Sequence, residues 1–362
     1  MPKVRVGVIG VGNCFSGLIQ GLEYYKRKGK VEYGLMKDKI GKYSIFDVDF
    51  VSAFDVDANK VGKKLSEAIY TAPNCVNWVK NVSLGKDVTV KESPLIDGIG
   101  VYLASLVKPK KQSKSVNQLR EEILEELRSS RTEVLLNYLP VGAQKATEFW
   151  ASIALEAKCG FVNCIPVFIA SNKKWAKKFE KEKVPIIGDD IKSQIGATIV
   201  HRTLTKLCVD RGAKIKRTYQ INVGGNTDFL NMLERKRLES KKVSKTEAVR
   251  SLIPGGIEDE NIYVGPSDFI PFLGNTKLAF IRIEGTMFAD VPFSIELRLE
   301  VDDKANSAGV AIDAVRYCKL ALDRNIGGPL IGPSAWLMKH PPVFYSDEEA
   351  RKLAEDFEKG LP

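Results

Sequence analysis

The chain has 362 residues, 44% of them hydrophobic, so it can bury more than one hydrophobic core and about two domains are expected. No apolar run approaches the ~18 residues of a membrane-spanning helix, and glycine interrupts the first apolar run too early for a secretory signal. The six cysteines form no CxxC pair, which disfavours a zinc knuckle and a disulfide framework. We therefore expect a cytoplasmic protein with reduced thiols and no membrane partner.

The net charge of +10 raises nucleic acid as a partner, but the distribution of the charge argues against it. A basic loop at residues 108–114 precedes a glutamate-rich helical pattern at 120–128, and residues 173–183 form a mixed-charge amphipathic helix. Both runs are typical of solvated surfaces. We predict no nucleic-acid partner, and part of the excess charge is available to attract an anionic metabolite.

The first 195 residues alternate apolar β-branched runs with helical patterns, which is typical of a parallel sheet with crossover helices. The predicted strands are residues 4–9, 49–54, 134–138, 161–165 and 184–187. This order predicts an α/β fold with a doubly wound parallel sheet of the Rossmann type, in a first domain that spans residues 1–195.

A glycine-rich turn, GVGNCFSG at residues 10–17, follows the first predicted strand. Such a turn lets backbone amides approach a pyrophosphate at the positive end of the next helix. Phe15 replaces the usual third glycine, so the alternative is a nucleotide-free domain in which the glycines only form a turn. The candidate cofactor-binding residues of this turn are Gly10, Gly12, Asn13 and Cys14.

Asp55 ends the second long strand, where an acidic residue commonly holds the ribose hydroxyls of a dinucleotide. An acidic residue here favours NAD over its 2′-phosphorylated form. Asp55 lies further from the glycine turn than the usual ~20 residues, so residues 29–47 are predicted to form an inserted excursion.

Polar turns follow three later strands, in Asn137-Tyr-Leu-Pro-Val-Gly142, Asn163-Cys-Ile-Pro166 and Gly188-Asp-Asp190. Ligands of doubly wound sheets bind outside the carboxyl ends of the strands, so these turns are expected at the site. Asn137 and Asp189 are therefore further candidates for cofactor binding. The alternative is ordinary turn chemistry, because Asn, Asp, Gly and Pro are common turn formers.

From about residue 214 the pattern changes to long strands at 216–223, 277–285 and 293–301, with a helix at about 244–252. We predict a second α+β domain over residues 196–301 that contains an antiparallel sheet and carries catalytic and oligomerisation functions. Residues 302–362, with a helix at 307–322, are expected to pack back onto the first domain.

Lysines are the most conspicuous candidate catalytic residues, because the chain has only two histidines, His201 and His340. Ser244-Lys-Thr-Glu247 has the form of a capping box, which predicts that Ser244 is the N-cap of a helix and that Lys245 is its first residue. With Lys241 nearby, an ammonium group and a helix N-terminus would converge on a phosphate. The alternative is a solvated, lysine-rich helix start.

Two further lysines stand in apolar surroundings, Lys277 at the start of a strand and Lys339 among apolar residues and prolines. A partly desolvated lysine close to other cations has a lowered pKa and can exchange protons near neutrality. The alternative for each is an ordinary lysine that extends its ammonium group into solvent.

The order of these motifs resembles that of the inositol-1-phosphate synthases, over nearly the whole chain and in a short form of the archaeal or bacterial type. The resemblance implies a homotetrameric isomerase that binds NAD. It would oxidise D-glucose 6-phosphate at C5, enolise it, close the ring by an internal aldol step and reduce it again to myo-inositol 1-phosphate (1D-myo-inositol 3-phosphate). The matching segments are residues 10–13, 53–57, 137–142, 188–193, 222–228, 240–245 and 275–277.

The same resemblance implies roles for individual residues. We expect Lys241 to transfer a proton at C5, Lys245 and Lys277 to hold the phosphate, and Lys339 to polarise the reacting oxygens. Asp189, Asp190 and Asp228 are also candidates for a divalent cation, although no ligand spacing requires one. The full set of implied catalytic residues is Lys241, Lys245, Lys277, Lys339, Asp190, Asn222 and Asp228.

Departures from the family pattern keep other activities open. Phe15 and the sequence of residues 193–196 differ from the common form, and the chain is shorter than eukaryotic members. The alternatives are an NAD-dependent cyclase, epimerase or dehydrogenase that acts on another sugar phosphate, or a non-catalytic protein that senses NAD or binds nucleic acid.

Overall fold

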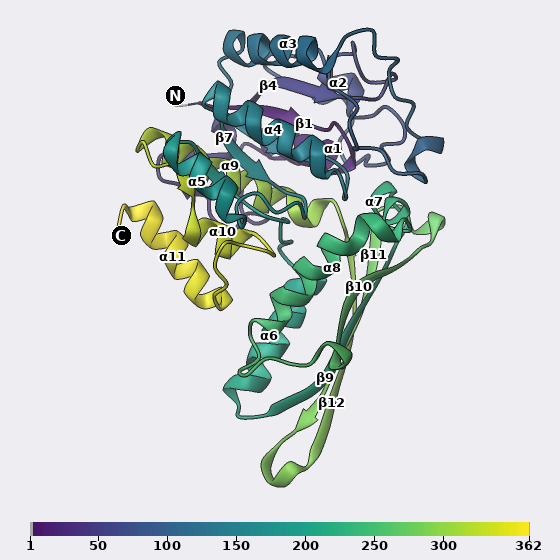
Figure 1. Cartoon of the computed structure of the whole chain (residues 1–362), viewed down its shortest axis with the longest axis vertical. Coiled ribbons are helices and arrows are strands. Elements are labelled where there is room, and N and C mark those ends of the chain that lie inside the picture. The colour runs from purple at the N-terminus through teal and green to yellow at the C-terminus, as the bar shows by residue number, and fades with distance from the viewer. Residues whose placement is uncertain (1–2, 362) are drawn as a thin grey trace.

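The computed structural model describes residues 3–361 and contains two large sheets, with the second extending away from the first (Figure 1). The first sheet has seven strands in the order β13-β8-β7-β6-β1-β4-β5, and neighbouring strands pair in parallel. The predicted α/β fold is confirmed. The strands are β1 (Val4–Ile9), β4 (Val48–Asp55), β5 (Lys91–Glu92), β6 (Val134–Asn137), β7 (Gly160–Asn163), β8 (Pro185–Ile187) and β13 (Gly328–Pro329).

Helices cover both faces of the first sheet because alternate strand residues point to opposite faces. Val4, Val6 and Val8 pack with α1 and α9, whereas Ile9 packs with α3 and α4 on the other face. The helices around this sheet are α1 (Asn13–Lys28), α2 (Leu65–Ala68), α3 (Val116–Ser129), α4 (Gln144–Ala157), α5 (Lys173–Lys181), α9 (Ala305–Asp323), α10 (Ile331–Leu337) and α11 (Asp347–Lys359).

The excursion between α1 and β4 carries a two-stranded ribbon, β2 (Lys39–Ile40) and β3 (Tyr43–Ser44). The guanidinium of Arg316, in α9, donates to the backbone carbonyls of Lys37 and Asp38 in this excursion. The excursion therefore packs on the helix that comes from the far end of the sequence.

The second sheet has the order β10-β9-β11-β12. An antiparallel sheet was predicted, but the sheet is mixed. β9 and β11 pair antiparallel, as do β11 and β12, but β10 runs parallel to β9. Strand β10 was missed because Gly265-Pro-Ser-Asp268 reads as a turn. The strands are β9 (Lys214–Gly224), β10 (Ile262–Phe269), β11 (Thr276–Thr286) and β12 (Pro292–Asp302).

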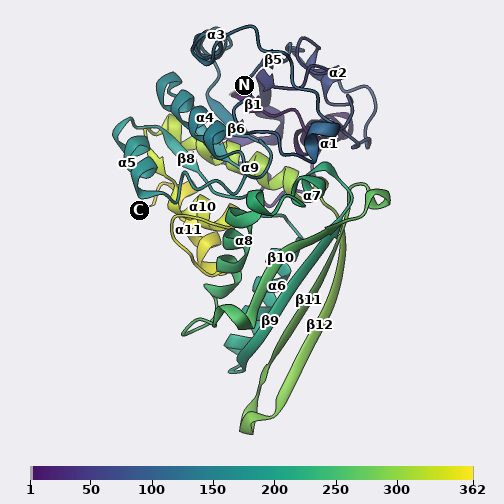
Figure 2. The ribbon, with the colours of Figure 1, turned by 45° about the vertical axis from the view of Figure 1, so that its right-hand side comes forward.

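Two helices, α6 (Ala197–Asp210) and α8 (Arg235–Arg250), pack against this sheet, and the short α7 (Thr227–Asn231) lies near the first sheet (Figure 2). Tyr219 and Tyr263 lie opposite each other on β9 and β10, Phe280 of β11 lies opposite Ile221 of β9, and all three aromatic side chains are exposed. They mark a sheet face that is open to solvent in residues 3–361. No helix in this part of the chain is both long and apolar enough to cross a membrane.

Helix α8 begins at Arg235, after an N-cap at Glu234, so the prediction that Ser244 caps a helix is wrong. Lys241, Ser244, Lys245, Ala248 and Val249 are buried, and this spacing of three and four residues forms one face of the helix. The upstream Arg, Lys, Glu and Leu residues favour helix and extend it past the capping-box pattern. Lys245 therefore reaches the site from a helix interior and not from a helix N-terminus.

Candidate functional site

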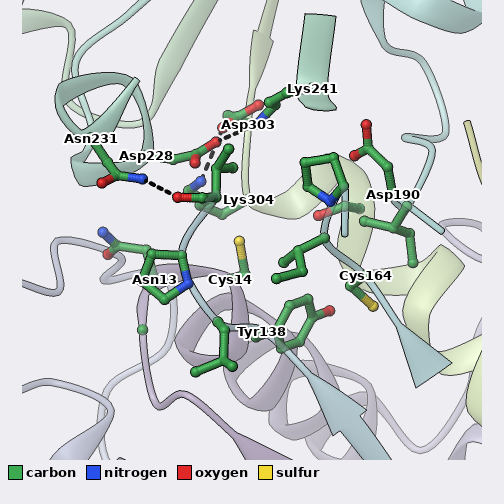
Figure 3. A pocket seen from close by; sticks show the side chains of 18 of the residues that line it. Asn13, Cys14, Tyr138, Cys164, Asp190, Asp228, Asn231, Lys241, Asp303 and Lys304 are labelled. Carbon is green, nitrogen blue, oxygen red and sulfur yellow. Dashed lines mark hydrogen bonds and ion pairs between the residues drawn. The ribbon is translucent and has the colours of Figure 1, made fainter. Parts of the chain in front are cut away.

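A cavity lies at the carboxyl edge of the parallel sheet, where the second sheet meets the first (Figure 3). Segments that follow β1, β6, β7 and β8 line it from one side, and α7, α8, β11 and the start of α9 line it from the other. We call it the lysine cavity. The predicted residues that line it are Lys241, Lys245, Lys277, Lys339, Asp190, Asp228, Gly12, Asn13 and Cys14.

Lys241 pairs with a carboxylate across α7 and α8. Its Nζ donates to Oδ2 of Asp228 at 3.0 Å. Burial disfavours the ammonium form, but Asp228 and Asp190 outweigh that effect and raise the pKa of Lys241. This lysine therefore stays charged near neutral pH.

Lys339 pairs with Asp190, which lies in the turn that follows β8 of the first sheet. Its Nζ donates to Oδ1 of Asp190 at 3.0 Å, and the Ser244 hydroxyl donates to Oδ2 of the same carboxylate at 2.7 Å. Burial lowers the pKa of Lys339, and the nearby Lys241 adds to this effect. The pKa of Asp190 is lowered, because Lys339 and Lys241 together outweigh the effect of its burial.

Lys245 makes no ion pair among residues 3–361, although it is only 3% exposed. Burial lowers its pKa well below the usual value, and the positive charges of Lys277, Lys241 and Lys339 lower it further. An ammonium group in these surroundings is stabilised by an anion, and a neutral amine here can accept a proton.

Two cavity residues, Asp303 and Lys304, were not among the sequence candidates. Asp303 accepts from Lys277 Nζ through Oδ1 at 3.1 Å and from Lys304 Nζ through Oδ2 at 3.0 Å. Figure 3 shows Asp228, Asp303, Lys241 and Lys304 gathered on one side of the cavity. The sequence does hold a signal for them, because the last two predicted strands follow each other and can form a hairpin. In that hairpin Thr276 lies opposite Asp302, which brings residues 303–304 close to Lys277.

A second cavity adjoins the lysine cavity and shares Gly12, Tyr138 and Thr227 with it. Gly10, Gly12 and Asp55 line it, together with apolar side chains such as Leu95 and Ile99. We call it the glycine-turn cavity. Its position beside a glycine turn and at the end of the neighbouring strand is typical of a dinucleotide site.

The backbone of the glycine turn leaves room for a ligand. Gly10 has a φ of 90°, and a Cβ there would lie 2.8 Å from the carbonyl oxygen of Tyr138. A Cβ on Gly12 would meet no protein atom within 4 Å. Gly10 is thus required by the fold, whereas the space at Gly12 is available to a bound group.

Three predicted residues lie outside the linings of both cavities. Asn137 donates to Oδ1 of Asn163 at 2.9 Å, and Asn222 donates to the carbonyl of Gly265 at 2.7 Å. The carboxylate of Asp189 accepts from the backbone amides of residues 169–171 and from the Ser171 hydroxyl. Burial raises the pKa of Asp189 to about 6, although these hydrogen bonds oppose the rise. These side chains therefore hold the strand ends in place beneath the site.

The residues considered for a divalent cation have other partners. Asp190 and Asp228 form ion pairs with lysines, and the oxygens of Asp189 accept protein hydrogen bonds. In residues 3–361 no group of three or more His, Cys, Asp or Glu side chains is arranged to hold a metal ion. The donor set at the site therefore does not fit a divalent cation.

Several known proteins are similar in sequence to this chain over nearly its whole length. A family model described as myo-inositol-1-phosphate synthase matches residues 196–304. The inositol-3-phosphate synthase of Mycolicibacterium smegmatis is 50% identical over 99% of this chain and 98% of its own length. That of Corynebacterium glutamicum is 48% identical over 98% of each chain.

Solved structures agree in fold. Ari2, known from a crystal structure, is 32% identical in sequence to this chain. The two structures superpose with a TM-score of 0.78 over 99% of both chains. A myo-inositol-1-phosphate synthase-related protein from Thermotoga maritima has a TM-score of 0.84 at 23% identity, with 99% of both chains covered. At that identity the second likeness supports the fold alone.

Proposed function

This chain belongs to the inositol-3-phosphate synthase family, and we propose on that basis that it converts D-glucose 6-phosphate into 1D-myo-inositol 3-phosphate with bound NAD. The reaction is an isomerisation, so the cofactor is not consumed. The observation that carries the proposal is the adjacency of two cavities: one lies at the glycine turn, the position typical of a dinucleotide site, and the other gathers buried lysines.

The glycine-turn cavity supports the assignment of NAD. The open space at Gly12 admits a pyrophosphate against the start of α1, and Asp55 lies at the end of β4 where a ribose is commonly held. When bound, NAD supplies the oxidation of C5 and the later reduction of the same carbon. Asn13 and Cys14 line the lysine cavity, so the glycine turn connects the two ligand sites.

The lysine cavity supports a sugar phosphate as the substrate. A phosphate group carries close to two negative charges at neutral pH and is stabilised by ammonium groups in a site with little water. Lys241 is held as a cation by Asp228, which suits it to bind the phosphate or a developing oxyanion.

The electrostatics favour a different proton carrier from the one expected by resemblance. We infer that Lys245 and Lys339, whose pKa values are lowered, exchange protons at the substrate hydroxyl and at the acidified carbon next to the ketone. Lys241, whose pKa is raised, then serves as an electrostatic group. Lys277 remains the proposed phosphate ligand, oriented by Asp303.

Phosphorus NMR of glucose 6-phosphate with the protein and NAD tests this function. We expect the substrate resonance to be replaced by that of inositol phosphate. The near-ultraviolet absorbance should not rise, because reduced nicotinamide does not accumulate. An unchanged phosphorus spectrum contradicts the proposal, and a stoichiometric rise in reduced nicotinamide indicates a simple dehydrogenase. The control is a sample from which bound cofactor has been removed and to which no NAD is added.

We also propose that the protein is a homotetramer of the cytoplasm. The exposed sheet face of Tyr219, Tyr263 and Phe280 supports an interface between copies, because aromatic side chains are enriched in interfaces. The six free thiols support a reducing compartment.

A further inference from the structure

Lys304 lines the lysine cavity, but it lies outside the set of four lysines that the sequence motifs single out. It stands directly before α9, as the N-cap residue, and is 3% exposed. An ammonium group so deeply buried requires strong compensation. Its surroundings therefore indicate what it does in the site.

Asp303 provides that compensation and is shared between two lysines. Lys304 Nζ lies 3.0 Å from Oδ2, where the side-chain amide of Asn226 also donates at 3.2 Å, and Lys277 Nζ lies 3.1 Å from Oδ1. With both oxygens engaged, the carboxylate cannot rotate without breaking a charged hydrogen bond. Lys304 thereby fixes the group that orients Lys277.

Other charged groups face Lys304 from each neighbouring element. Asp228 of α7 attracts its ammonium group, and Cys14 of α1 lies close to it. Lys241 of α8 also stabilises the negative charge of Asp303. Asp228 is already paired with Lys241. Lys304 thus joins the two lysine–carboxylate pairs into one network beside the glycine turn.

The charge of the cavity depends on this lysine. Among its described lining residues, three carboxylates face five ammonium groups, and only Lys245 lacks a carboxylate partner. Two positive charges remain uncompensated when all five amines are protonated, as they would be once a bound anion stabilises the ammonium form of Lys245. This excess equals the charge of a phosphate monoester dianion, and without Lys304 it falls to one.

We propose that Lys304 is a positioning residue that fits the site to a dianionic phosphate. Through Asp303 it holds Lys277 in place, and its own charge supplies part of the excess that the dianion neutralises. The inference rests on the proposed function only in taking the ligand to be a phosphate ester.

Direct calorimetric binding of two tetrahedral anions to the NAD-loaded protein at pH 7.5 tests this role. Inorganic phosphate is mostly a dianion at this pH, and methanesulfonate is a monoanion of similar shape. The wild-type protein should prefer phosphate by about tenfold or more. Lys304→Met should lose most of that preference, whereas Lys304→Arg, which keeps the charge, should retain most of it.

The matched control is Lys242→Met, which removes an equal charge from an exposed position on α8. It should bind both anions as the wild type does, and all variants should retain NAD affinity. Equal preference for phosphate in Lys304→Met and wild type overturns the proposal, as does an equal loss in Lys242→Met. If Lys304→Met does not fold, a wild-type protein without preference for the dianion overturns it. None of these measurements requires turnover, so a failure here is distinct from a failure of the proposed reaction.

Discussion

At the scale of single residues, the lysines of the cavity differ by their partners and not by their burial. Lys241 and Lys245 are one turn apart on the same face of α8, and both are nearly inaccessible to solvent. Asp228 pairs with the first, whereas no carboxylate in residues 3–361 pairs with the second. Two identical side chains thus behave differently: Lys241 stays charged near neutral pH, whereas Lys245 can lose its proton.

Replacing Lys245 by methionine should stabilise the protein while abolishing turnover. The unfolded state binds a proton that the native state binds weakly, so the charged lysine costs stability below its unfolded pKa. We expect the free energy of unfolding at pH 7 to rise by about 1 kcal/mol, measured by urea denaturation. Lys241→Met, which leaves Asp228 unpaired, should lower it. A destabilised Lys245→Met protein would contradict this account.

The two glycines of the turn should respond oppositely to alanine. Gly12→Ala meets no protein atom and should leave the melting temperature within about 2 °C of wild type, while weakening NAD binding because the added methyl occupies ligand space. Gly10→Ala places a Cβ 2.8 Å from a backbone oxygen at a φ of 90° and should lower the melting temperature. Differential scanning fluorimetry and NAD titration separate the two effects. Unchanged NAD affinity in Gly12→Ala would place the pyrophosphate elsewhere.

At the scale of elements, strands with strong apolar runs and the second half of α8 could be predicted from the sequence, whereas the start of α8 and strand β10 could not. The parallel strands have buried β-branched residues on both faces, so their pattern is unambiguous. Helix α8 buries lysines and a serine on its packed face, which hydrophobic periodicity does not detect. Its polar face is explained only by the carboxylates that other elements bring to it.

The same limit applies to the candidate site. The four predicted lysines do line one cavity, but Asn137, Asp189 and Asn222 are engaged within the protein. A turn-forming residue at a strand end has the same sequence signature whether it faces a ligand or the strands below. Only the three-dimensional arrangement distinguishes the two.

The packing of α6 on β9 predicts an acid-sensitive element. His201 is fully buried, its Nε2 lies 2.7 Å from the Thr218 hydroxyl, and burial lowers its pKa to about 4. Between pH 6.5 and 4 the unfolded state binds a proton that the native state does not, so stability falls as the pH falls through this range.

The variant His201→Leu should remove that dependence. At pH 5 the wild type should have lost about 2 kcal/mol relative to pH 7.5 that the variant does not lose. Urea denaturation of both proteins at each pH measures the difference. Parallel pH profiles for the two proteins would show that His201 is not the titrating group.

At the scale of the whole molecule, the open face of the second sheet should control assembly. The double variant Tyr219→Glu, Phe280→Glu places two charges where aromatic side chains are exposed, and we expect it to dissociate the proposed tetramer into smaller species. Sedimentation velocity measures the result. Tyr33→Glu, which alters an exposed aromatic residue of the first domain, is the control. A tetramer that persists in the double variant would place the interface on another surface.

The joint between the two sheets has a mechanical consequence. Asp190 follows β8 of the first sheet and pairs with Lys339, whereas Lys241 and Lys245 lie on α8 and Lys277 lies on β11 of the second sheet. Ammonium groups of like charge therefore face one another across this boundary, although Asp190 attracts Lys241 and accepts a hydrogen bond from Ser244. We therefore expect a bound phosphate to cancel this repulsion and to strengthen the contact between the two sheets.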